Sequence, residues 1–402
     1  MPTTNSGSSD GRGEPVRKRH AKLFHKKTRT GCQRCRMRRC DEGKPICSNC
    51  KRLDLVCEFP RVAAVARDSS KHSDKQKHSE SDLESVESES RRKLELELFY
   101  HYSTETAKSI AIGESTQDIW GPIMCSAALR SDAVLNSICL LSALHKAHKE
   151  KLSGIKETID VQKCISTYLH LALNAHHKDL EHLTAENIDY ACLVSSAFRV
   201  YDFQRLKNRG LKPYTPPVDW LRMTGATHIV FLQAMELARD NPESIGWRMT
   251  SGAFYVVEER QKLQHSEELL HLLEHRESRE RAEAWSDKTH MVYSLAISVV
   301  GAIWRFRDAE ELCPELHLRL LILPMLLDDD FVAFVEERRP RALAILAHYF
   351  VMLRWLRNMW YIGDSGHREA WAIIQELPRE WQGLLDEPLR MLESSRCQDT
   401  IV

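Results

Sequence analysis

From Arg91 onward, apolar residues recur three and four positions apart, and the Val, Ile and Thr alternation typical of strands is rare. This spacing places apolar side chains on one face of an α-helix. Prolines fall at or near the gaps between the segments. The pattern predicts an all-α region whose helices span Lys93–Ile112, Asp132–Lys149, Thr158–His177, Ala185–Leu206, Trp220–Arg239, Trp247–His275, Arg279–Arg307, Arg341–Tyr361 and His367–Leu377.

The residues before Arg91 lack this pattern. Residues 1–20 are rich in Ser, Gly, Arg and Lys, and the run from Ala63 to Ser90 is full of Ser, Lys, Asp and Glu. Such segments bury too little apolar surface to offset the entropy of ordering. We therefore expect a disordered basic tail at 1–24 and a disordered linker at 62–92. The linker has no sustained heptads, so nothing in it indicates a coiled coil that would enforce a dimer.

Charge divides the chain in a way that its formal net charge of zero conceals. From Gly11 to Arg61 there are sixteen Lys or Arg against five Asp or Glu, which gives this stretch +11 and the remainder −11. A basic stretch of this kind is suited to a polyanion such as nucleic acid. The basic run between Arg17 and Arg29 also fits a nuclear import signal and phosphate contacts, with a solvated disordered tail as the alternative.

No segment indicates export or a membrane anchor. The N-terminus lacks the apolar run of a signal peptide, so we expect the twelve cysteines to be reduced. The longest apolar stretch, Met291–Trp304, is too short to cross a bilayer of roughly 30 Å as a helix, and we interpret it as a core helix.

Six cysteines form a compact block that is typical of metal binding. Two CxxC pairs are each followed by a lone cysteine. A CxxC turn brings two thiolates to one side of a tight bend, where backbone N–H groups stabilise their charge. Three sulfurs cannot complete a tetrahedral zinc site, but two zinc ions that share two of six sulfurs each obtain four ligands. The expected ligands are Cys32, Cys35, Cys40, Cys47, Cys50 and Cys57, and metal binding should supply most of the folding free energy of this small module.

With these residues, the passage from His25 to Cys57 resembles the fungal Zn2Cys6 binuclear cluster domain. The resemblance implies two zinc ions, with Cys32 and Cys47 bridging them and Pro45 shaping the loop between the halves. It also implies binding of double-stranded DNA at CGG-type triplets in the major groove.

Basic side chains near the first CxxC pair are the candidates for DNA contacts. The resemblance assigns base contacts to Arg38 and Arg39, with Arg36 beside them, and arginine can bond O6 and N7 of one guanine together. Lys26 and Lys27 precede the cluster and are candidates for phosphate contacts.

One spacing departs from the family pattern. Four residues separate Cys35 from Cys40, where the family has six. An extended chain of four residues can span the gap, at roughly 3.3 to 3.6 Å per residue. Three explanations stay open: a tightened working cluster, a gene-model or splice error, and a natural variant with weakened DNA binding.

The helical region resembles a fungus-specific regulatory domain found behind such clusters, and its C-terminal part resembles the closing helices of that domain in the sterol uptake control group. The resemblance rests on the tract from Leu94 to Thr104, on Trp120, on the segment from Leu135 to His145, and on the stretch from Arg341 to Trp381. It implies a hydrophobic, sterol-like ligand, although simple packing accounts for any single aromatic or Leu residue. Family members bind DNA as dimers or as monomers, so the oligomeric state stays open.

An enzyme is the weaker alternative. His271, Glu274 and His275 form an HxxEH arrangement like that of inverted zinc peptidases, but no third ligand follows, and a solvated helix face is the simpler interpretation. No Gly-rich phosphate loop or nucleophile elbow is present. The six remaining cysteines are scattered singly and are expected to be core or surface thiols.

The expected architecture is a small Zn2Cys6 module and a large all-α domain joined by a disordered linker. We place the DNA-binding domain at 25–61, the helical regulatory domain at 93–392 and a tail at 393–402. The predicted function is nuclear, zinc-dependent, sequence-specific regulation of RNA polymerase II transcription, with DNA and the transcription machinery as partners. The alternative is an interaction protein whose shortened cluster binds zinc, in its minimal form through Cys32, Cys35, Cys47 and Cys50, but no longer reads DNA.

Overall fold

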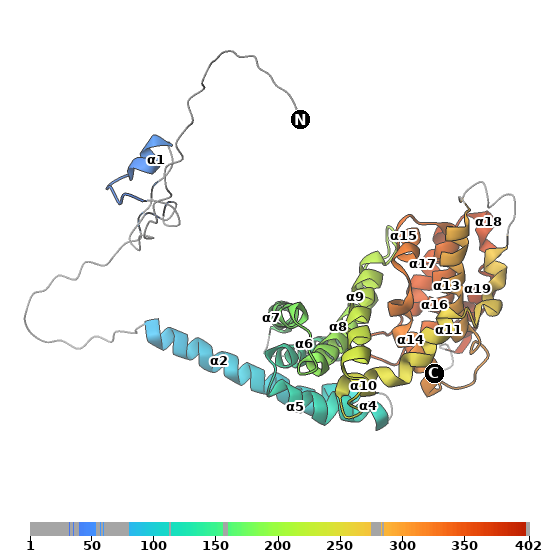
Figure 1. Cartoon of the computed structure of the whole chain (residues 1–402), viewed down its shortest axis with the longest axis horizontal. Helices are drawn as coiled ribbons and strands as arrows, with labels where there is room; N and C mark the ends of the chain where they lie inside the picture. The colour runs from blue at the N-terminus through green and yellow to red at the C-terminus, as the bar shows by residue number, and fades with distance from the viewer. Residues whose placement is uncertain are drawn as a thin grey trace, which may run out of the picture. The chain divides into compact units, whose positions relative to one another are not determined.

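The chain separates into two compact units, Met1–Lys77 and His78–Val402, which are described individually. All regular elements in the described residues are helical, as the apolar spacing predicts (Figure 1). The computed structural model describes residues 32, 35, 40–53, 57, 59, 80–111, 114–155, 160–274, 283 and 285–398.

The helical unit begins with α2, which passes through a π-helical turn at Tyr102–Thr106 into short helices, and continues with four long helices. Side-chain caps explain where several of these helices start. The Ser131 hydroxyl accepts the amide of Val134 at the start of α6, and Asp160 does the same for Lys163 at the start of α7. The elements are α2 (Glu80–His101), α3 (Ala107–Ile110), α4 (Glu114–Asp118), α5 (Met124–Ala128), α6 (Asp132–Ser153), α7 (Val161–Glu181), α8 (Ile188–Asn208) and α9 (Val218–Leu237).

The second half of the unit is arranged around a helix that is buried on all sides. Every residue of α16 from Arg341 to Met352 is buried, which matches its nearly continuous apolar sequence. It packs against α13, α17 and α19 (Figure 1). The elements are α10 (Ile245–Thr250), α11 (Phe254–Gln261), α13 (Asp287–Trp304), α14 (Pro314–Ile322), α15 (Asp329–Glu336), α16 (Pro340–Met352), α17 (Ser365–Glu376), α18 (Arg379–Gln382) and α19 (Asp386–Gln398).

The C-terminal end of α8 is held by residues from the far end of the chain. Arg368 of α17 donates to the carbonyls of Lys207 and Arg209, so its guanidinium binds two carbonyl groups at the end of α8. Arg209 in turn pairs with Glu369, which is 1% exposed. The Lys207 ammonium donates to the carbonyl of Trp360. These contacts, which we call the α8 clamp, fix this turn against the segment from Trp360 to Glu369.

The prediction of one helix from Trp247 to His275 is wrong. The segment forms α10, a 3-10 turn, α11 and a second 3-10 helix at Ser266–Leu273, and Leu263 between the last two has a φ of 53°. The cause is tertiary, because the His265 carbonyl lies against Gly301 of α13. A Cβ placed on Gly301 would lie 2.0 Å from that oxygen, so the close approach requires glycine.

Other boundaries also differ from the predictions. The helix expected from Arg279 begins at Asp287, where the Ser286 hydroxyl accepts the amide of Thr289. α2 begins at Glu80, inside the segment expected to be linker. The apolar spacing missed α4 and α5, α14 and α15, and α18 and α19, which lie in stretches that prolines and short loops interrupt.

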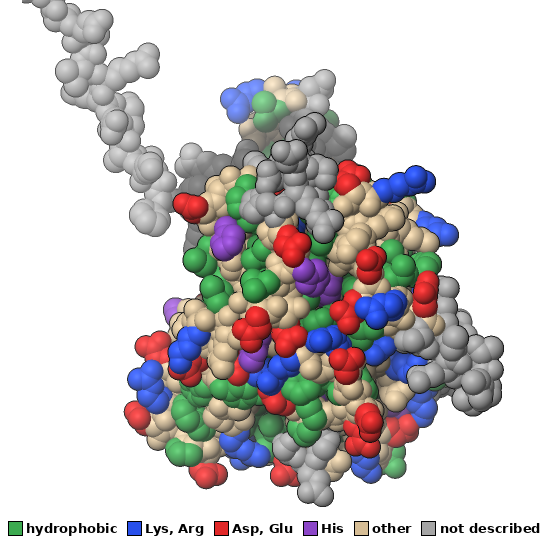
Figure 2. Space-filling view, turned by 90° about the vertical axis from the view of Figure 1, so that its right-hand side faces the viewer, with side chains coloured by type: hydrophobic (Ala, Val, Ile, Leu, Met, Phe, Trp, Pro, Cys, Tyr) green, Lys and Arg blue, Asp and Glu red, His purple; other side chains and the backbone are tan. Residues whose placement is uncertain are grey.

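The surface of the helical unit carries both signs of charge. On the face shown in Figure 2, Lys and Arg side chains alternate with Asp and Glu over short distances, with apolar side chains between them. This face therefore lacks the single-signed surface that binding to DNA phosphates requires. No helix among the described residues has the length and apolarity needed to cross a membrane.

Candidate metal centre

Backbone geometry brings each CxxC pair together. The amide of Cys35 donates to the carbonyl of Cys32 at 3.1 Å, which closes the first pair into a tight turn. The second pair opens α1 (Ser48–Arg52), where Cys47 is the N-cap with extended backbone angles and its carbonyl accepts the amide of Lys51 at 2.9 Å. Both pairs therefore present two sulfurs on one side of a bend, as the spacing predicts.

The four CxxC sulfurs lie at the separations that a tetrahedral zinc ion needs. The Sγ atoms of Cys32 and Cys47 are 3.8 Å apart, as are those of Cys32 and Cys50. The Cys35 sulfur lies 3.6 Å from that of Cys50 and 3.9 Å from that of Cys47. A tetrahedron with Zn–S bonds of about 2.3 Å has edges of about 3.8 Å. The four residues are buried, so the donor set fits zinc in type, spacing and shielding from water.

The two lone cysteines, Cys40 and Cys57, accept hydrogen bonds from different members of this group. The amide of Cys32 donates to the Cys40 sulfur at 3.4 Å, and the amide of Cys47 donates to the Cys57 sulfur at 3.3 Å. The backbone amides of Cys32 and Cys47 therefore each donate a hydrogen bond to one lone cysteine. The Sγ atoms of Cys32 and Cys47 also lie in contact with each other. Cys40 reaches the group even though only four residues separate it from Cys35. The short spacing thus allows the third cysteine to join the cluster.

The loop between the halves is fixed by Asp41. Its carboxylate accepts the amide of Ser48 at 3.0 Å and also the Ser48 hydroxyl, which ties the loop to the start of α1. These bonds lower the pKa of Asp41. Pro45 lies in this loop after a cis peptide bond, and the Lys44 ammonium lies 5.9 Å from the centre of the Phe59 ring.

Burial and hydrogen bonds shift the pKa values of these thiols in opposite directions. The backbone N–H of Cys50 stabilises the Cys47 thiolate and lowers its pKa, whereas burial raises the pKa of Cys50. Thiolates this close repel one another, so the set cannot all ionise without positive charge at its centre. A divalent zinc ion supplies that charge and makes the thiolate form stable.

The predicted DNA contacts fall outside the described residues. Arg36, Arg38 and Arg39 lie between Cys35 and Cys40, and Lys26 and Lys27 precede Cys32; their assignment stays a prediction. Some His, Cys, Asp and Glu side chains have ligand atoms close enough together to share a metal ion. Among the described residues, all such groups lie in the cysteine block.

The HxxEH segment keeps His271 and Glu274 exposed, as the simpler interpretation expected, although its helix is of the 3-10 type. His271 lies in the 3-10 helix at Ser266–Leu273, its ring centre is 6.0 Å from that of His348, and partial burial of the ring lowers its pKa. His275 lies outside the described residues. Leu269, Leu272 and Leu273 of the same segment are buried, so the segment packs into the core of the unit.

The single cysteines of the helical unit take up separate positions. Cys139, Cys164 and Cys192 are buried and Cys125 is half-buried. Cys313 has a local role that its spacing did not indicate, because its sulfur accepts the amide of Leu316 and caps α14. An isolated cysteine directly before a proline at a helix start was the available signal.

Comparison with known proteins identifies the cysteine block. Residues 30–63 match the fungal Zn(2)-Cys(6) binuclear cluster domain. The six cysteines of this domain lie near one another, consistent with two zinc ions.

Two relatives align over most of the chain. A Zn(2)-C6 fungal-type transcription factor, afumD, from Aspergillus fumigatus is 28% identical over 371 residues, which are 87% of this chain and 94% of that protein. A Zn(2)-C6 fungal-type transcription factor from Gibberella zeae is 22% identical over 431 aligned residues, covering 91% of this chain and 86% of that protein. The likeness therefore includes the helical unit as well as the cluster.

The likeness to the sterol uptake control proteins is much shorter. Sterol uptake control protein 2 from Saccharomyces cerevisiae is 44% identical over 41 residues, which are 10% of this chain and 4% of that protein. A match of this length is too short to compare the helical units.

Proposed function

We propose that this chain, whose residues 30–63 form a fungal Zn(2)-Cys(6) binuclear cluster domain, is a sequence-specific DNA-binding regulator of RNA polymerase II transcription. Its full-length relatives are transcription factors, which supports DNA-binding transcription regulation and implies that the chain is not an enzyme. The observation that carries the proposal is the group of buried sulfurs in which Cys32 lies 3.8 Å from Cys47 and from Cys50, and Cys47 lies 3.9 Å from Cys35, the spacing of zinc ligands.

In the proposed cluster, Cys32 and Cys47 bridge two zinc ions. One ion is completed by Cys35 and Cys40, and the other by Cys50 and Cys57. The bonds from the Cys32 amide to Cys40 and from the Cys47 amide to Cys57 support this division, because each places a lone cysteine beside a bridging one. Folding of this unit then depends on zinc, since the apolar cluster among its described residues consists of the cysteines and Phe59.

The cluster presents its basic residues to double-stranded DNA. In this proposal Arg38 and Arg39, with Arg36, read guanines of CGG-type triplets, and Lys26 and Lys27 contact phosphates. The excess of +11 between Gly11 and Arg61 supports a polyanion partner. Loss of a base-reading arginine should reduce discrimination between sequences, whereas loss of a phosphate contact should weaken binding to all sequences alike.

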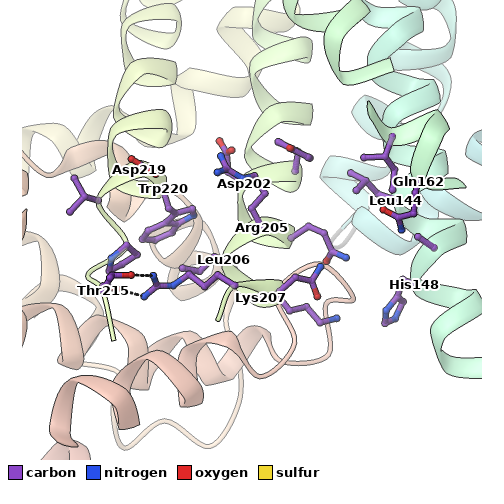
Figure 3. A pocket seen from close by; sticks show the side chains of 18 of the residues that line it. Leu144, His148, Gln162, Asp202, Arg205, Leu206, Lys207, Thr215, Asp219 and Trp220 are labelled. Atoms are coloured by element: carbon purple, nitrogen blue, oxygen red, sulfur yellow. Dashed lines mark hydrogen bonds between the residues drawn. The ribbon is translucent and has the colours of Figure 1, made fainter. Parts of the chain in front are cut away.

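The remaining assignments complete the proposal. The chain acts in the nucleus and contacts the transcription machinery, with DNA binding at 25–61 and regulation at 93–392. A hydrophobic, sterol-like ligand of the helical domain stays a prediction. The cavity at the C-terminal end of α8 does not support it, because many of its lining side chains are charged (Figure 3).

The test measures zinc per full-length chain, together with binding to a CGG duplex and to a duplex of scrambled sequence. Two zinc ions and a preference for the CGG duplex are expected. Changing Arg38 and Arg39 to Ala should lower that preference about tenfold or more, since one bidentate base contact contributes about 1 to 3 kcal/mol. Changing Lys26 and Lys27 to Ala is the matched control and should weaken both duplexes equally. Equal loss on both duplexes from the arginine pair would contradict the base-reading role.

A second candidate function has one observation in its favour. The ligand atoms of Cys32, Cys35, Cys47 and Cys50 all lie within 4.8 Å of one another, which is enough for a single-zinc site. A chain with one zinc ion and no preference for CGG would be an interaction protein with a residual cluster. A variant with an apolar residue and a lysine inserted after Arg39 restores the usual spacing. If only that variant prefers the CGG duplex, the short spacing between Cys35 and Cys40 is the cause of the lost DNA recognition.

A further inference from the structure

A side chain from the second half of the cysteine block reaches a sulfur of the first half. Asn49 lies in α1, directly before Cys50. Its side-chain amide nitrogen, Nδ2, donates a hydrogen bond to the Sγ atom of Cys35 at 3.4 Å. Cys35 belongs to the first CxxC pair and Cys50 to the second. The hydrogen bond therefore ties the two halves together by a residue that is not one of the six cysteines.

Arg52 determines which end of the Asn49 amide faces the sulfur. The Nη2 group of Arg52 donates to Oδ1 of Asn49 at 3.2 Å, and the two residues lie three positions apart in α1. Residues at this spacing are neighbours on a helix surface. The amide has an acceptor at one end and donors at the other, so the guanidinium that binds its oxygen leaves the NH2 group directed at Cys35. Arg52 thus orients the donor that Cys35 accepts.

Cys35 differs from the lone cysteines in the donor that it receives. The sulfurs of Cys40 and Cys57 accept backbone amides. Among the described residues, the N–H group that bonds to the Cys35 sulfur is the side chain of Asn49. A backbone amide is present whatever the residue type, whereas this donor depends on asparagine at position 49. A single substitution can therefore remove it.

Burial and charge make this hydrogen bond favourable for a zinc-bound thiolate. Cys35 is 4% exposed and Asn49 is half-buried, whereas Arg52 is exposed. Hydrogen bonds to a charged acceptor are roughly twice as strong as those between neutral groups. The positive charge of Arg52 lies at the outer end of the arrangement and adds to the stabilisation of the negatively charged thiolate.

We propose that Asn49, oriented by Arg52, is a positioning residue that keeps the Cys35 thiolate on zinc and slows release of that ion. The proposal rests on the proposed zinc cluster and adds a residue outside the cysteines to it. Partners of this kind, which contact a ligand rather than the metal, orient the ligand and tune the site. The support matters most at Cys35, because the segment from Cys35 to Cys40 is two residues shorter than the family pattern.

The experiment measures transfer of zinc from the zinc-loaded full-length chain to a chromogenic chelator. Asn49→Leu keeps a side chain of similar size and removes the N–H donor. Zinc should leave this variant roughly tenfold faster or more, since loss of such a partner weakens metal binding roughly 10- to 100-fold. Arg52→Ala should speed release by less, because the amide remains and loses only its orientation. Lys51→Ala is the matched control: it removes the same charge from a neighbouring exposed position and should leave the rate unchanged.

A second readout separates a role at Cys35 from a general loosening of the cluster. Iodoacetamide alkylates a thiolate that has left zinc, with iodide as the leaving group, and mass spectrometry locates the modified cysteine. In Asn49→Leu and Arg52→Ala, alkylation of Cys35 should become faster relative to that of Cys57. Cys57 is the internal reference, because both variants retain the backbone amide that bonds to its sulfur. A merely structural role of Asn49 would raise both rates together.

The outcomes distinguish this inference from the cluster on which it rests. Equal rates of zinc release from Asn49→Leu and the unchanged chain would overturn the inference, and so would equal acceleration of alkylation at Cys35 and Cys57. If Asn49→Leu does not take up two zinc ions, the comparison of Arg52→Ala with Lys51→Ala decides, because both change exposed residues. An unchanged chain that binds no zinc would overturn the proposed cluster and this inference with it.

Discussion

Replacing Asp202 by Asn should stabilise the protein more at high pH than at low pH. The carboxylate is buried and has no hydrogen-bond partner among the described residues, and its pKa rises from 3.8 to about 7 on folding. The folded state therefore holds a proton that the unfolded state releases at lower pH. Stability from this group is greatest below about pH 4, falls as the pH rises, and levels off above about pH 7.

The size of the effect follows from that pKa. Each pKa unit corresponds to about 1.4 kcal/mol, so the ionised carboxylate costs the folded state about 4 kcal/mol when the pH is above both pKa values. At pH 5 only about 1 to 2 kcal/mol of this cost is present. The unfolding free energy of Asp202→Asn minus that of the unchanged chain should therefore rise by about 2 to 3 kcal/mol between pH 5 and pH 8.

Urea unfolding followed by circular dichroism at a series of pH values measures this difference. Asp308→Asn is the matched control, since Asp308 is 88% exposed and should give a nearly constant difference. A constant difference for Asp202→Asn as well would refute the reasoning, because it would mean that the carboxylate is solvated or paired in the folded protein.

Three further predictions concern packing, the α8 clamp and the cluster. Gly301→Ala should lower the unfolding free energy by about 1 to 3 kcal/mol or more, measured by urea unfolding, because its Cβ would meet a backbone carbonyl at 2.0 Å. Glu369→Ala should cost about 3 to 5 kcal/mol by leaving Arg209 uncompensated, and adding Arg209→Met should recover much of it; no recovery would contradict the pairing. Asp41→Ala should speed the loss of zinc to a chelator severalfold by freeing the loop from Ser48, whereas an unchanged rate would show that this bond does not hold the cluster.

The sequence predicted those features that depend on nearby residues. The CxxC pairs close through bonds that span three residues, such as the one from Cys35 to Cys32, so their spacing alone indicates metal binding. The buried helix α16 is equally apparent, because nearly every residue in it is apolar. In both cases the structure depends on residues that are close together in the sequence.

Features that depend on distant residues were missed. The break after Gln261 follows from contact between His265 and Gly301, and periodicity within the segment gives no sign of it. The cavity is built by side chains from four helices, so no local motif marks it. One local signal was available, because an aspartate inside an apolar helix such as α8 indicates either a buried partner or a binding site.

The α8 clamp has a consequence for synthesis of the chain. Arg209 and Glu369 are 160 residues apart, and the carbonyls at the end of α8 have no guanidinium donor until Arg368 has been synthesised. Because chains emerge from the ribosome N-terminus first, α6 to α9 are complete long before these partners exist. The wall of the cavity next to Arg209 is therefore finished only when the segment from Trp360 to Glu369 has emerged. A message truncated before that point would encode most of the helices without a finished cavity.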